Sequence, residues 1–164
     1  MRSLTLIAGL LLSVACGLTA CGQTSTNVEE PVEDTYSTET AGLQALLQEG
    51  MPAPLEAKWS HQVQDDFYNE GKLVAVLTLS DEATLRLKEK LNPERDEGGE
   101  YLPGILREWF PPAVRENFYE IEGTGGMLAS RVPQYRASDI LASPYAHGQA
   151  FIIDNYLLVI GQSM

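Results

Sequence analysis

The chain has 164 residues, of which 44% are hydrophobic, and it carries a formal net charge of −12. This length is enough for one domain with a sizeable core. The acidic charge argues against a nucleic-acid partner, because neutralising phosphates requires clustered Lys and Arg. Both cysteines, Cys16 and Cys21, lie near the N-terminus, which excludes disulfides and cysteine-based chemistry in the rest of the chain.

The N-terminal segment has the pattern of a secretory signal. Arg2 gives it a positive start, residues 4–15 form an uncharged and mainly apolar run, and small residues follow. The run is shorter than the roughly 20 apolar residues that a membrane-spanning helix needs. We therefore expect residues 1–20 to be a signal peptide and not an uncleaved anchor.

The end of this segment, Leu18-Thr19-Ala20-Cys21, resembles the lipobox of bacterial lipoprotein precursors. The resemblance covers about the first 21 residues. It implies cleavage before Cys21, diacylglycerol on the Cys21 sulfur and acylation of the new amine by a fatty acid such as palmitate. Two or more acyl chains hold a protein stably on a membrane, whereas one chain binds only marginally.

Two neighbouring features bear on this anchor. Gly22 is not Asp, so the resemblance implies the outer membrane in an envelope with two membranes. Cys16 is a second candidate thiol, but Ser13-Val14-Ala15-Cys16 is a poorer match and lies inside the apolar run. The lipidation site is therefore assigned to Cys21, and the partner it implies is membrane lipid.

Residues 22–40 are rich in Ser, Thr and Glu and poor in apolar side chains. Such a composition buries too little apolar surface to offset the entropy of ordering, so a disordered acidic tether is predicted. A flexible coil of this length has a root-mean-square reach of about 24 Å. Together with the lipidated cysteine the tether spans residues 21–40, and the globular domain is assigned to residues 41–164.

The domain opens with a short helix predicted over residues 41–48, ended by Gly50. Residues 57–65 form a strand candidate, and residues 66–71 a turn into the clearest strand, residues 72–79. The predicted faces are Leu43, Leu46 and Leu47 on the helix, and Trp59, His61, Val63 and Asp65 on the first strand.

A second helix is predicted to begin after Ser80 and to end at Asn92-Pro93. Ser80 suits the N-cap, and charges of the expected sign lie near both ends. These charged residues are Asp81 and Glu82 in the first turn, and Lys88 and Lys90 in the last, and the apolar stripe is Thr84, Leu87 and Leu91. Residues 94–100 then read as a polar loop.

Apolar residues recur at helical spacing over residues 102–110 and predict a third helix, which Pro111-Pro112 would end. Pro112 suits the first position of a further helical segment that runs to residue 118. The members of the apolar stripe are Leu102, Ile105, Leu106, Trp109 and Phe110. An aromatic stripe of this kind is more typical of a core than of a ligand-binding face.

The remaining chain is mainly β. Strands are predicted over residues 119–122 and 127–132, joined by a glycine-rich turn. Residues 133–145 read as irregular with one turn near residues 138–141. Residues 149–153 and 156–160 predict a hairpin whose apolar arms are buried on both faces. The fold class is therefore α+β: a single domain with a mainly antiparallel sheet, about three helical segments and a C-terminal β-hairpin.

The two histidines are candidate metal ligands or catalytic bases. His61 with Asp65 and Asp66, joined from afar by His147, could bind a cation. Metal sites need three or four convergent ligands, and neither histidine belongs to a paired motif. We therefore expect no metal and no cofactor.

Two other patterns suggest catalysis only weakly. Ser143, His147 and Asp139 could form a hydrolase triad, but no G-x-S-x-G elbow surrounds the serine. Glu120 and Glu122 could act as a glycosidase pair, although adjacent acids are common in so acidic a chain. No catalytic residue is therefore assigned.

Two glycine-rich segments suggest ligand loops. Residues 123–126 could cradle a phosphate, but no helix follows them, so a hairpin turn is the better interpretation. Residues 96–100 carry oxygen ligands but lack the spacing of a calcium loop. We interpret them as a solvated loop.

The sequence thus predicts a membrane-anchored envelope lipoprotein whose domain is a non-enzymatic module that binds an envelope protein, a glycan or a small ligand. The alternative is a lipid-tethered hydrolase that uses His147 or His61. A hydrolase predicts one of these histidines in a pocket, within about 3.2 Å of a Ser, Asp or Glu. A third interpretation, support of envelope integrity or exclusion of phage, rests on analogy with other small lipoproteins.

Overall fold

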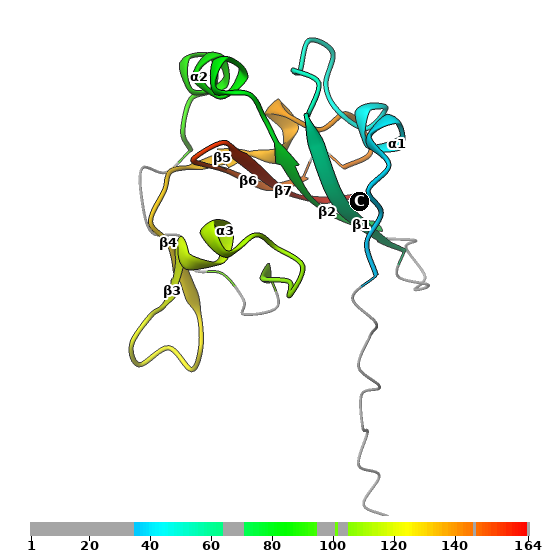
Figure 1. Cartoon of the computed structure of the whole chain (residues 1–164). Coiled ribbons are helices and arrows are strands. Elements are labelled where there is room, and N and C mark those ends of the chain that lie inside the picture. The colour runs from blue at the N-terminus through cyan, green and yellow to red at the C-terminus, as the bar shows by residue number, and fades with distance from the viewer. Residues whose placement is uncertain (1–34, 64–70, 95–100, 102–104, 146, 164) are drawn as a thin grey trace, which may run out of the picture. The chain divides into compact units, whose positions relative to one another are not determined.

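The computed structural model in Figure 1 describes residues 35–63, 71–94, 101, 105–145 and 147–163. The predicted signal peptide, Cys21 and most of the tether lie outside these residues. So do Asp65 and Asp66 of the predicted metal site, and residues 96–100 of the calcium-loop candidate.

The described residues form an α+β domain with a five-stranded antiparallel sheet and a separate two-stranded one, as the sequence predicts. The helices are α1 (Thr40–Gln44), α2 (Asp81–Lys90) and α3 (Pro112–Glu116), with a 3-10 turn η2 (Ala137–Asp139). The strands are β1 (Glu56–Val63), β2 (Gly71–Thr78), β3 (Phe118–Glu120), β4 (Leu128–Ser130), β5 (Gln134–Arg136), β6 (His147–Ile153) and β7 (Tyr156–Gln162).

The large sheet has the strand order β1-β2-β7-β6-β5, and each neighbouring pair is antiparallel. The predicted C-terminal hairpin is confirmed as β6–β7, with β7 at the centre of the sheet. It turns at Asp154 and Asn155, and Asp154 adopts a φ of 51°, as the favoured two-residue hairpin turns require.

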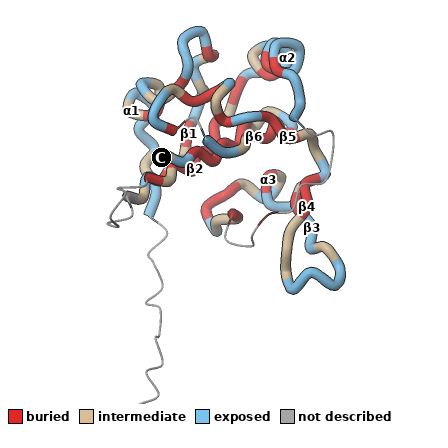
Figure 2. The backbone as a smooth tube through the Cα atoms, turned by 180° about the vertical axis from the view of Figure 1, so that it is seen from behind, coloured by how far each residue is buried: buried red, intermediate tan, exposed pale blue. Residues whose placement is uncertain are grey.

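Alternation along the buried strands divides the core between the two faces of the sheet. Leu73, Ala75 and Leu77 of β2 belong to one cluster, whereas Val74 and Val76 belong to the other. We call these the α2 face and the α3 face. Figure 1 shows α1 and α2 on one side of the sheet, and α3 with the β3–β4 hairpin on the other. The burial colours of Figure 2 agree, because most of β2 and the second half of β6 are buried while the tip of the β3–β4 hairpin is mainly exposed.

The β2–α2 unit forms as the sequence predicts. The Ser80 hydroxyl oxygen accepts a hydrogen bond from the Ala83 N–H at 3.2 Å and so caps α2. Thr84 and Leu87 of the predicted stripe are buried within the helix, and Leu91 is buried just after it. Helix α3 also begins as predicted, with Pro112 at its first position.

The predicted helix over residues 102–110 is wrong where the structure describes it, because residues 106–110 form turns and irregular chain. Its apolar residues are nevertheless core residues: Ile105, Trp109 and Phe110 are buried on the α3 face. Pro103 and Gly104 in the sequence disfavour helix in this segment. The spacing therefore reflects contact with the sheet and not a helical period.

The prediction that residues 133–145 are irregular also needs correction. Gln134–Arg136 forms β5, which pairs with Gln149–Phe151 of β6. A strand of three residues is too short to show an alternating pattern, so only pairing with its neighbour reveals it. The predicted turn near residues 138–141 corresponds to η2.

The folded part of the chain begins earlier than residue 41. Ser37 and Trp59 exchange two backbone hydrogen bonds, of 2.7 and 2.9 Å, across the outer edge of β1. The Trp59 indole N–H donates to the Glu39 carbonyl oxygen at 3.0 Å, and the Tyr36 ring packs on Trp109 with centroids 5.4 Å apart. Residues 36–40 therefore belong to the domain and not to the predicted tether.

Candidate functional site

His61 forms a hydrogen bond with a tyrosine and not with a nucleophile or a carboxylate. Its Nε2 lies 2.5 Å from the Tyr145 hydroxyl, and the two rings meet edge to face. His61 is exposed on β1, whereas Tyr145 is buried in the core of the α2 face. The pair links β1 to the chain that precedes β6.

The structure does not assemble the candidate triad. His147 is exposed at the start of β6, and Ser143 is exposed before Pro144. No hydrogen bond joins Ser143, His147 and Asp139 within the described residues. Asp139 instead lines a cleft with residues from α2, described below. The pattern that suggests a hydrolase is therefore not supported by contacts between these side chains.

The glycine-rich residues 123–126 are confirmed as the connection of a hairpin, between β3 and β4. A helix does not follow them, since Leu128–Ser130 is a strand. Glu120 and Glu122 are both exposed beside this connection. Neither feature lies in a cavity described here, so neither provides an enclosed site.

A cavity of about 460 Å³ lies beside the edge of the large sheet, where β1 and β2 meet the N-terminal segment. Its position follows from the register, because Glu56 pairs with Thr78 and Lys58 with Val76. Its lining combines polar and apolar side chains. They are the hydroxyl-bearing Thr38, Thr40 and Thr78, the charged Glu56 and Lys58, and the apolar Leu55, Val76 and Pro111. We call it the sheet-edge cavity.

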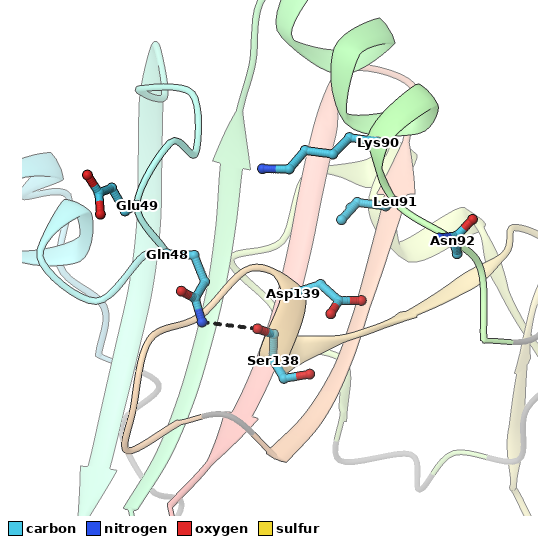
Figure 3. Close-up of a pocket in the computed structure, with 7 residues that line it drawn as sticks. All are labelled: Gln48, Glu49, Lys90, Leu91, Asn92, Ser138 and Asp139. Atoms are coloured by element: carbon cyan, nitrogen blue, oxygen red, sulfur yellow. Dashed lines mark hydrogen bonds between the residues drawn. The ribbon is translucent and has the colours of Figure 1, made fainter.

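A second, more polar cleft of about 340 Å³ lies between the end of α2 and η2. Lys90 and Asn92 come from α2 and the residues after it, and Asp139 from η2 (Figure 3). The Gln48 side-chain amide donates to the carbonyl oxygens of Ser138 and Leu141, at 3.1 and 3.0 Å. These bonds fasten the chain after α1 to the chain around η2 and so fix the floor of the cleft.

Among the residues that the structure describes, the pKa values of two side chains are shifted, and sequence patterns pointed to neither. Burial, with a smaller contribution from the positive charge of Arg107, lowers the pKa of Lys72 below its usual 10.5. Burial raises the pKa of Tyr135 above its usual 10.0. Lys72 is the only lysine of a strand that is otherwise almost entirely apolar, and this contrast is the signal that could have identified it.

The described residues contain no group of three or more His, Cys, Asp and Glu side chains placed to hold a metal ion. Within the same residues, no helix is long and apolar enough to cross a membrane. The chain matches no protein-family model, and comparisons with curated proteins and with solved structures found no significant similarity. A function must therefore be inferred from the residues themselves.

Proposed function

We propose that the protein is a lipid-anchored envelope protein whose domain is a non-enzymatic binding module. The observation that carries the anchor is the sequence Leu18-Thr19-Ala20-Cys21 at the end of a signal-like segment. Cys21 is the only thiol that remains once residues 1–20 are removed. A thiol is the group to which diacylglycerol is attached in the lipoproteins that this segment resembles.

The sheet-edge cavity supports the binding role. Its volume of about 460 Å³ falls in the usual range for small-ligand pockets, roughly 300–1,000 Å³. Apolar side chains with a few hydroxyl and charged groups suit a ligand that has both apolar and polar groups, such as a sugar unit or a peptide segment. An envelope glycan or an envelope protein is therefore the proposed partner.

The attachment of residues 36–40 adds to this argument. Thr38 and Thr40 line the cavity, and Ser37 between Tyr36 and Thr38 is hydrogen-bonded to β1. The chain leading from the proposed anchor therefore reaches the domain beside the cavity. A ligand bound there would lie next to the point where the tether begins.

The hydrolase alternative finds less support. His61 is engaged by Tyr145, and His147 makes no hydrogen bond to Ser, Asp or Glu within the described residues. Neither histidine lines the sheet-edge cavity or the cleft between the end of α2 and η2. A general base must lie within hydrogen-bond reach of the group it serves.

The anchor is tested by comparing Cys21→Ala with the matched control Cys16→Ala in fractionated cells. We expect the Cys21 variant to leave the membrane fraction and the Cys16 variant to remain there. Mass spectrometry of the wild-type N-terminus should find a diacylated or triacylated Cys21. Membrane retention of the Cys21 variant, with an unmodified wild-type thiol, would overturn the proposed anchor.

The binding role is tested with Thr78→Trp, which fills the sheet-edge cavity, against Thr124→Trp at the exposed β3–β4 turn. Full-length protein in detergent is exposed to defined fragments of envelope glycan and to solubilised envelope proteins. We expect binding to survive in the Thr124 variant and to fall in the Thr78 variant. Turnover of ester, peptide or glycoside substrates that His61→Ala or His147→Ala abolishes would instead establish the hydrolase.

A further inference from the structure

Four strands place polar side chains in one row at an end of the large sheet. Gln62 pairs with Lys72, Lys72 with Gln162, and Gln162 with His147. Residues directly opposite each other in antiparallel strands share a face, with Cβ atoms about 4.5–5.5 Å apart. Lys72 is two residues from Val74, so the row lies on the α3 face.

Arg107 brings a second positive charge to this row. It belongs to the segment of residues 105–110, which covers the α3 face through Ile105, Trp109 and Phe110. Its charge acts on Lys72, whose pKa it lowers in addition to the effect of burial. The positive charge of Arg107 therefore acts on a partly buried lysine, although acids outnumber bases by 23 to 11 in the whole chain.

The chemistry of the row is that of hydrogen-bond donors. An ammonium and a guanidinium only donate, amide groups each offer an NH₂, and imidazole offers at least one N–H. In the described part of the chain, the side chains of Gln62, Lys72, Gln162 and His147 make no hydrogen bond or ion pair with one another or with other residues. The ion pair between Arg86 and Glu82 lies on α2 and involves none of these four side chains.

We propose that this row is a binding site, centred on Lys72, for a small oxyanion: a phosphate or carboxylate group. Hydrogen bonds from cations to such oxygens are the strong ones in proteins, and Arg is suited to two-point contact with them. A bound oxyanion would accept hydrogen bonds from the Lys72 ammonium. The inference goes beyond the proposed function, because the row lies at the opposite end of the sheet from the sheet-edge cavity, and it does not depend on the lipid anchor.

The probes are inorganic phosphate and acetate, each compared with chloride at equal ionic strength, on the full protein in detergent micelles. Amide and side-chain NMR signals report where each anion binds. We expect saturable shifts at Lys72, Gln162 and His147, and the probe that binds more tightly identifies the preferred oxyanion. Shifts confined to the sheet-edge cavity, or equal shifts with chloride, would overturn the proposal.

Lys72→Met tests the central contact, and Lys88→Met on the exposed side of α2 is the control of equal charge change. We expect anion affinity to fall at least about tenfold in the Lys72 variant, the loss typical of one charge-assisted hydrogen bond. The Lys88 variant should bind like the wild type. Equal affinities in both variants would contradict the site.

A measurement on the wild-type protein covers the case in which Lys72→Met does not fold. Reductive methylation of lysines is followed by mass spectrometry with and without the anion. Bound anion should slow modification of Lys72 severalfold and leave Lys88 unchanged. Equal rates at Lys72 would rule out the site even if the Cys21 experiment supports the anchor, so the two failures are distinguishable.

Discussion

The Tyr145 hydroxyl lies 2.5 Å from Nε2 of His61, although 84 positions separate the two residues in the chain. Gly71 lies against both groups, since a Cβ at that position would be 3.2 Å from the Tyr145 ring and 3.3 Å from His61 Nε2. The contact therefore joins β1, β2 and the chain before β6 at one end of the α2 face. Its role in this structure is to hold these elements together.

Removing this hydrogen bond should lower the free energy of unfolding. Tyr145→Phe keeps the buried ring but removes the hydroxyl, so we expect a loss of about 1 kcal/mol in the free energy of unfolding. A double-mutant cycle with His61→Ala should give a coupling energy of similar size. Urea denaturation measures both, and additive effects of the two substitutions would show that the contact contributes nothing.

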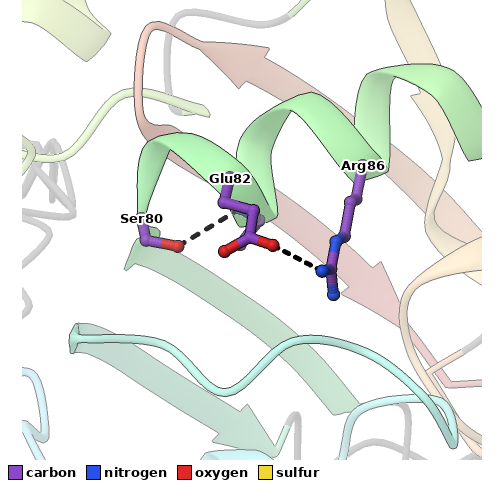
Figure 4. A network of polar contacts seen from close by, with 4 residues as sticks. Ser80, Glu82 and Arg86 are labelled. Atoms are coloured by element: carbon purple, nitrogen blue, oxygen red, sulfur yellow. Dashed lines mark hydrogen bonds and ion pairs between the residues drawn. The ribbon is translucent and has the colours of Figure 1, made fainter.

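The N-cap of α2 should matter more than the ion pair on the surface of the same helix. Figure 4 shows Ser80 at the start of α2 and Arg86 reaching Glu82 one turn away. Ser80→Ala should lower the free energy of unfolding by about 1 kcal/mol, because a helix N–H loses its partner. Arg86→Gln should cost at most about 0.5 kcal/mol, since both side chains are 75% exposed. Thermal or urea unfolding compares the two variants, and a larger effect of Arg86→Gln would contradict this ranking.

Gly148 should be intolerant of any side chain. Its φ is +129°, and a Cβ there would lie 2.0 Å from the Ile160 carbonyl oxygen of the neighbouring strand β7. Gly148→Ala should therefore destabilise the protein by about 2 kcal/mol or more. Gly125→Ala is the matched control, because φ is +71° there but no atom lies within 4 Å of the added Cβ. Its cost should be about 1 kcal/mol, and equal unfolding midpoints for the two variants would refute the clash.

Lys72 should make the free energy of unfolding depend on pH in the alkaline range. Its pKa is lowered in the folded state, so between that pKa and 10.5 the unfolded chain binds more protons than the folded one. The contribution of Lys72 to the free energy of unfolding therefore rises with pH between its lowered pKa and 10.5. The same contribution is lost as pH falls through the lowered pKa.

Tyr135 opposes this trend, because its raised pKa makes stability fall as pH rises through 10. The difference in unfolding free energy between wild type and Lys72→Met isolates Lys72, since both proteins contain Tyr135. This difference should shift in favour of the wild type as pH increases. Lys88→Met should show no such trend, and a flat difference for Lys72→Met would contradict the effect of burial.

The sequence by itself determined the elements whose signals are local. Strand β2 and hairpin β6–β7 are long apolar runs, and Ser80 with the charges that follow it defines the start of α2. Pro112 likewise marks the start of α3. In each case nearby residues supply the physical cause, so no distant contact is needed to predict the element.

Only the tertiary structure decided the features that depend on distant partners. Strand β5 forms because it pairs with β6. In residues 106–110, the spacing of the apolar side chains reflects their contact with the sheet and not a helical period, so the sequence pattern misled. The pairing of Ser37 with Trp59 brings residues 36–40 into the domain despite their polar composition.

The candidate sites divide in the same way. The anchor at Cys21 is a prediction from a contiguous motif, which a sequence can display in full. The contact between His61 and Tyr145, and the row that runs from Gln62 through Lys72 and Gln162 to His147, depend on strand register. Register is set by the order and pairing of whole strands, so only the folded chain brings these side chains together.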